Sequence, residues 1–173
     1  MATGSILLPI SGAVPSDGST TNAAPEIIRV KGSAAAPAPH FVEARFDPST
    51  DEHVQWSFRM PQDYSSAPVL KLLWKANVTA NSVVWGSRLS AVTPADVDTP
   101  NEHAFATANT ATTAANATEA RRLVETSITL TNADSVAAGD LVILQVYRDA
   151  DNASDTVTSD AELVAASLEY TTA

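Results

Sequence analysis

Apolar and polar residues alternate along most of the chain, with the period of two that is typical of β-strands with one buried face. The alternation is clearest at residues 53–59, where Val54, Trp56 and Phe58 share one face and polar side chains occupy the other. In residues 141–148 both faces are mostly apolar, which predicts a central strand covered on both sides. These two segments are expected to anchor the core.

The other strands are predicted from the same alternation and from the turn residues between the strands. They cover residues 26–30, 40–46, 68–76, 82–92, 104–112, 122–131 and 162–170. A strand is preferred to a helix at 104–112 because the many Thr residues weaken a helix. About eight strands at intervals of roughly ten residues predict an all-β fold, an antiparallel β-sandwich of the jelly-roll type.

The first 25 residues differ in composition from the rest. They are rich in Gly, Pro, Ser, Thr and Ala, and they hold one short apolar cluster, formed by Ile6, Leu7, Leu8 and Ile10. Pro9 breaks any helix that this cluster would start, so the segment is not expected to bury these side chains by folding alone. We therefore predict an extended N-terminal arm over 1–25, whose four apolar side chains contact a partner, and a jelly-roll domain over 26–173.

Composition narrows the choice of partners. The formal net charge of the 173 residues is −10, which argues against nucleic-acid and membrane partners because it repels phosphate and anionic lipid. Aromatic residues are only 6% of the chain, so the core is expected to be thin and the subunits to complete one another's burial. Without cysteine, stability rests on packing or assembly rather than on disulfides.

The Asp-rich segment 149–160 is the best candidate for a metal site. Asp149, Asp151 and Asp155 resemble the start of a calcium loop, but Ser154 and Asp160 stand where an EF-hand requires Gly and Glu. The segment is interpreted as a solvated turn whose short polar side chains cap their own backbone. No metal and no other cofactor is therefore expected.

Like the metal site, a set of catalytic residues is not well supported by the sequence. The histidines lie far apart, without a second ligand at zinc spacing: His40, His53 and His103. Glu43 and Asp47 are weak grounds for a glycosidase pair, because the chain has few aromatic residues to stack a sugar. The sequence predicts a protein that is not an enzyme.

The last half of the chain resembles small jelly-roll structural proteins of tailed bacteriophages. The resemblance rests on Gly139-Asp140-Leu141-Val142 opening a strand, on Arg148 and Asp149 closing it, and on Asp160-Ala161-Glu162-Leu163 leading to a strand that ends in Glu169-Tyr170. Residues 40–64 are also similar to the opening part of these proteins. None of these motifs carries a catalytic residue.

Such proteins occur as head decoration or cement proteins, usually trimers seated between capsomers, and as domains of tail fibres or baseplates. The small single domain, its arm and the lack of fibre-like repeats favour decoration. The resemblance then implies a homotrimer that binds the major capsid protein on the outer surface of the virion. A tail-fibre, baseplate or host-receptor-binding component is the alternative, and a non-viral sugar-binding module is a third possibility.

Overall fold

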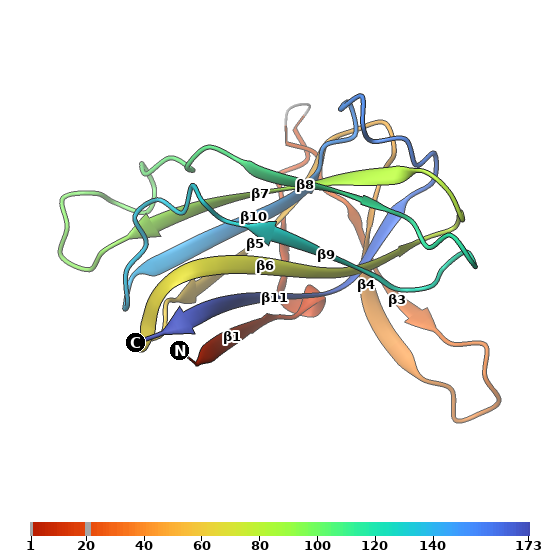
Figure 1. The fold of residues 1–173 in the computed structure, drawn as a ribbon, viewed down its shortest axis with the longest axis horizontal. Helices are drawn as coiled ribbons and strands as arrows, with labels where there is room; N and C mark the ends of the chain where they lie inside the picture. Colours follow the sequence, from red (N-terminus) through yellow and green to blue (C-terminus); the bar gives the residue numbers. More distant parts are fainter. Residues whose placement is uncertain (1, 20–21) are drawn as a thin grey trace.

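The computed structural model describes residues 2–19 and 22–173, and it is built from strands (Figure 1). The strands are β1 (Thr3–Leu8), β2 (Val14–Pro15), β3 (Glu26–Lys31), β4 (His40–Phe46), β5 (Glu52–Arg59), β6 (Tyr64–Ala76), β7 (Ser82–Val92), β8 (Asn109–Ala114), β9 (Val124–Thr129), β10 (Leu141–Arg148) and β11 (Ala161–Thr172). One 3-10 turn, η1 (Ile10–Gly12), follows β1. No helix among the described residues has the length and apolar character needed to cross a membrane.

The strands form two antiparallel sheets that pack face to face. Sheet A has the order β3-β4-β11-β6-β9, and β1 pairs with β11 as well. Sheet B has the order β2-β5-β10-β7-β8, so β10 is central, as its two apolar faces predicted. The prediction of an antiparallel β-sandwich is confirmed.

The core lies between the two sheets and centres on three aromatic side chains. The ring of Trp85 packs edge-on against Phe46 and Trp74, with centroid distances of 5.0 and 6.0 Å. The indole N–H of Trp74 donates to the Thr126 hydroxyl at 2.8 Å, which satisfies a polar group that burial would otherwise leave unpaired. The inward face predicted for residues 53–59 lies in this core as well.

One predicted strand is displaced along the chain. The structure places β8 at 109–114 instead of 104–112. Residues 105–108 lie beside Arg88 at the surface of sheet B, and the backbone N–H of Ala106 donates to the Leu89 carbonyl at 2.9 Å. This hydrogen bond holds residues 105–108 beside β7 without a continuous β-ladder. The alternation of small residues in 104–112 was therefore not enough to locate the strand.

The N-terminal segment belongs to the sandwich. β1 pairs with β11 from Thr3 opposite Thr171 to Leu8 opposite Ala166, so the end of the chain supplies the partner that the segment lacks locally. Leu8 and Ile10 are 2% and 3% exposed in the core of their own chain, and Ile6 packs against that core. The prediction that folding would not bury these side chains is therefore wrong for them. Leu7 is 72% exposed, and its contact with a partner stays a prediction.

The connection between β10 and β11 is more than a solvated turn, because a buried ion pair ties it to the end of the sandwich. Arg148 has no exposed surface and forms a bidentate pair with Asp155, with N–O distances of 3.0 and 2.7 Å. Its remaining N–H groups donate to the carbonyls of Phe46, Val157 and Ser159. Thus every donor of the guanidinium is used, as burial of a charge requires.

Candidate interaction surfaces

The outer face of sheet A carries apolar side chains beside charged ones. One hollow of about 200 Å³ is lined by Leu7 of β1, Leu73 of β6 and Ala165 of β11. A second hollow, of about 330 Å³, lies among Phe41, Lys75, Arg121, Leu123 and Val164. Leu123 is 50% exposed, so this face offers aliphatic surface at two places.

A cluster of charges on this face is already paired within the chain. Glu43 has no exposed surface; it accepts from Lys75 at 2.7 Å and from Arg45 at 3.0 Å. Lys75 also pairs with Glu162, and its ammonium lies 5.8 Å from the centre of the Phe41 ring. The hydrogen bond that Arg45 donates to Glu43 raises the pKa of Arg45 above its ordinary value. Because the charges in this cluster neutralise one another, covering the cluster costs less desolvation than covering unpaired ions.

The outer face of sheet B differs from that of sheet A, because its aromatic side chains are buried against one another and leave no open surface. Tyr147 of β10 stacks on His53 of β5 at 5.2 Å, and the Arg88 guanidinium lies 5.1 Å from the Tyr147 ring. Burial raises the pKa of Tyr147 and lowers that of His53, so both side chains are neutral at pH 7. With exposed fractions of 5% and 6%, they support the fold and present no open platform.

The aspartates singled out in the sequence separate into two groups. Asp149 and Asp151 meet Asp51, and oxygens of the three carboxylates lie within 4.8 Å of one another. Repulsion, mainly from Asp51, raises the pKa of Asp151. Asp51 also accepts from the Ala150 N–H at 2.7 Å, and the fourth aspartate, Asp155, pairs with Arg148. Three acidic groups alone do not define a cation site, since such groups are common on surfaces.

The remaining candidates for chemistry are not brought together among the described residues. Glu43 is held by its cations, whereas Asp47 accepts from the backbone and hydroxyl of Ser49, which lowers the pKa of Asp47. Glu43 and Asp47 therefore do not form a glycosidase pair. His40 is exposed on β4 and takes no part in the stack that His53 forms with Tyr147.

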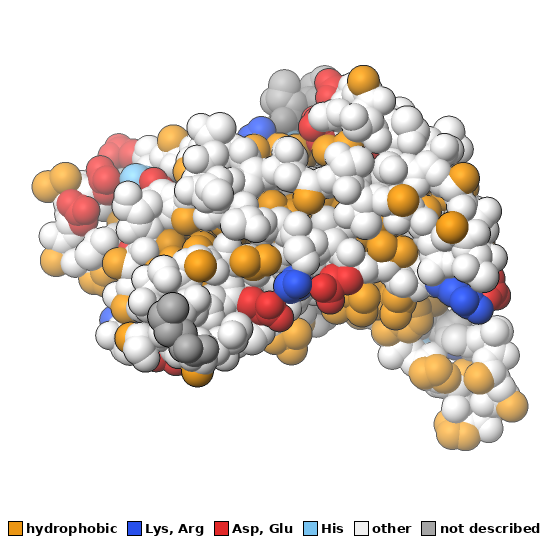
Figure 2. Space-filling model, in the orientation of Figure 1, with side chains coloured by type: hydrophobic (Ala, Val, Ile, Leu, Met, Phe, Trp, Pro, Cys, Tyr) orange, Lys and Arg blue, Asp and Glu red, His pale blue; other side chains and the backbone are white. Residues whose placement is uncertain are grey.

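The third histidine, His103, fixes a loop at one end of the molecule. Its Nε2 lies 2.7 Å from Asp134 and its Nδ1 lies 3.3 Å from Asp98. The bond to Asp134 raises the pKa of His103. Figure 2 shows acidic side chains and a histidine gathered at this end, and Lys or Arg beside acidic groups at the opposite end.

Comparison with known proteins shows architecture only. No family model matches the chain, and no curated protein does. The CBM22-1 xylan-binding domain of Xyn10C from Paenibacillus barcinonensis is similar at a TM-score of 0.53 and 8% identity, over 97% of this chain and 94% of that one. A family 11 carbohydrate-binding module from Clostridium thermocellum has a TM-score of 0.46 and 10% identity, over 100% and 97%. The chain has a jelly-roll fold.

Proposed function

We propose that this protein is a non-enzymatic structural component of a phage virion, and that it binds the head surface as an oligomer in the manner of a decoration or cement protein. The observation that carries the proposal is the outer face of sheet A. Leu7 and Leu123 lie exposed there, beside hollows lined by further aliphatic side chains. A face with exposed aliphatic side chains, on which Lys71 and Lys75 pair with carboxylates of the same chain, is suited to burial against another protein.

The net charge favours a position on the protein shell of the head over a role in binding DNA or lipid. A surface of −10 keeps free subunits apart and is repelled by phosphate, so attachment has to come from local apolar and polar contacts with protein. The major capsid protein and further copies of this chain are the proposed partners. The similarity to known binding domains is in keeping with a protein that has no catalytic activity.

Carbohydrate binding is the second candidate, because the xylan-binding domain shares the fold. The described surface argues against it. The large hydrophobic side chains that lie exposed there are Leu7, Val14, Val97 and Leu123, and none of them is aromatic. Sugar rings are held by flat aromatic faces, and the three tryptophans are buried at 4% exposure or less.

A reconstitution experiment tests the proposal. Heads purified from a phage that lacks the gene are mixed with the purified chain, and binding is measured by co-sedimentation. We expect saturable binding to heads, and Leu7→Asp should weaken it by about tenfold or more, because an aliphatic contact is replaced by a charge. Val14→Asp is the matched control, since Val14 is 62% exposed on sheet B. Binding to tails or to xylan in place of heads would overturn the proposal.

A further inference from the structure

The segment between β7 and β8 presents an apolar residue between acidic ones. Residues 93–103, which we call the acidic loop, contain Asp96, Asp98 and Glu102 and neither Lys nor Arg. Val97 stands between the two aspartates and is 92% exposed. A single exposed apolar side chain needs no explanation by itself, so its meaning depends on whether a matching surface exists.

The acidic loop is held firmly at its base. Besides the contacts of His103 with Asp98 and Asp134, the Asp134 carboxylate accepts from the Ala91 N–H at 2.8 Å. The Thr99 carbonyl accepts from the backbone N–H groups of Glu102 and His103 at 3.1 and 3.0 Å. These bonds shape the loop before any contact forms, which lowers the ordering entropy lost on docking.

A surface that matches the loop lies on the outer face of sheet A. The hollow among Phe41, Lys75, Arg121, Leu123 and Val164 measures about 330 Å³, which is room for roughly ten waters and therefore ample for a valine side chain. Arg121 is exposed at its edge and lines a neighbouring hollow too. Arg122 is paired with Glu119, whereas no described carboxylate forms an ion pair with Arg121. A pocket lined by Phe41, Leu123 and Val164, with an unpaired cation at its rim, complements a valine flanked by aspartates.

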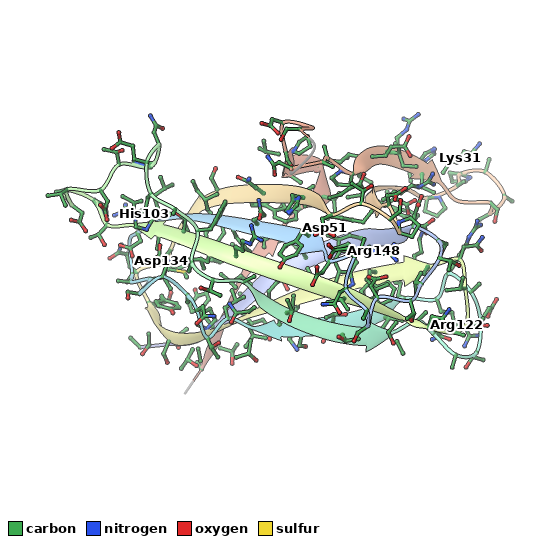
Figure 3. The ribbon with its side chains drawn as sticks, turned by 90° about the horizontal axis from the view of Figure 1, so that it is seen from above. Lys31, Asp51, His103, Arg122, Asp134 and Arg148 are labelled. Carbon is green, nitrogen blue, oxygen red and sulfur yellow. The ribbon has the colours of Figure 1, made fainter. Side chains whose placement is uncertain are left out.

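The two surfaces lie at opposite ends of one chain. Figure 3 shows His103 and Asp134, which hold the acidic loop, at one end, and Lys31 and Arg122 at the other. The loop therefore does not reach the pocket of its own chain. We propose that the acidic loop docks into the pocket of a second copy, with Val97 inserted and Asp96 or Asp98 facing Arg121.

This contact uses two different surfaces, so it is heterologous and generates a closed ring or an open filament. This contact would build the oligomer named in the proposed function, and in that sense it rests on that proposal. The contact itself does not require a phage head. Solution mass of the purified chain tests the inference, whereas binding to heads tests the function.

The experiment is sedimentation velocity on the full chain over a range of concentrations. Wild type is expected to associate, and Val97→Asp should weaken association by at least about tenfold, which is about 1.4 kcal/mol. Val14→Asp is the matched control, with an exposed valine at another place, and should associate like wild type. A wild-type monomer at every concentration, or equal association of the two variants, overturns the proposal.

Charge reversal adds a stricter test. Asp96→Arg alone and Arg121→Asp alone should each lose association, because like charges then meet at the contact. Arg121 has a φ of 65°, a conformation that Asp tolerates better than most residues, so this variant should fold. The double variant Asp96→Arg/Arg121→Asp should associate again, since every loop then meets an opposite charge. A folded double variant that fails to associate contradicts the docking.

Discussion

The buried pair of Arg148 and Asp155 should dominate the stability of the end of the sandwich that it closes. The Arg148 and Asp155 side chains are 0% and 1% exposed, and the carboxylate also accepts from the Val84 N–H at 3.0 Å. Asp155→Asn removes the negative charge and leaves a buried guanidinium without its counter-ion. Losing one partner of a buried pair costs about 3–5 kcal/mol, because the other charge stays desolvated.

That cost should appear as a lower melting temperature. For a domain of 150–250 residues each kcal/mol corresponds to about 2–4 °C, so we expect a drop of roughly 6–20 °C by calorimetry. Arg148→Met should cost a similar amount, and the double variant should lose clearly less than the sum of the two, since it leaves no unpaired charge.

An exposed pair of similar length provides the control. Arg122 and Glu119 approach to 2.8 Å, but their side chains are 55% and 65% exposed. Arg122→Met should therefore change stability by less than about 1 kcal/mol. The reasoning is refuted if Asp155→Asn lowers the melting temperature no more than Arg122→Met does.

Three further predictions concern two histidines, a closely packed glycine and the aspartate cluster. Because the pKa of His103 is raised, its stabilising contribution is complete below pH 6.5 and is lost as pH rises through the folded pKa, so His103→Gln should remove this pH dependence of the melting temperature. Because the pKa of His53 is lowered, its contribution is complete above pH 6.5 and is lost as pH falls, so the pH dependence that His53→Gln removes from the melting temperature should have the opposite slope. Gly86→Ala should cost about 1–3 kcal/mol in denaturant titrations, because its Cβ would lie 2.1 Å from Cζ of Tyr147; an unchanged midpoint would mean that this ring is free to move. Asp51→Asn should raise the melting temperature slightly by relieving repulsion at Asp151, and a chelator should leave it unchanged; a fall of many degrees on chelation would instead reveal a metal at this cluster.

The sequence predicted those strands whose alternation includes large side chains. Val54 and Trp56 on β5 pack inward as expected, because a pleated strand with bulky groups on one face has only one face to bury. Segments of Ala and Thr gave a weaker signal, since small side chains fix neither a face nor an end, and β8 was displaced for this reason.

Contacts between distant parts of the chain were not predictable in the same way. The partner of β1 lies more than 150 residues away in β11, so the local sequence of residues 3–8 contains no sign of it. The burial of Arg148 was visible in the sequence pattern, because Arg148 lies on the same inward face of a central strand as Val142, Leu144 and Val146. An arginine at that position requires a buried acceptor, and the Asp-rich segment that follows supplies one in Asp155.

The most direct test of the proposed role is the location of the protein in the particle. Gold-labelled antibody against the chain is applied to intact virions and viewed by electron microscopy, with virions that lack the gene as the control. A decoration protein predicts label over all faces of the head, at a copy number that scales with the number of capsomers. Label confined to the tail or its tip, or absent from the particle, would contradict the account.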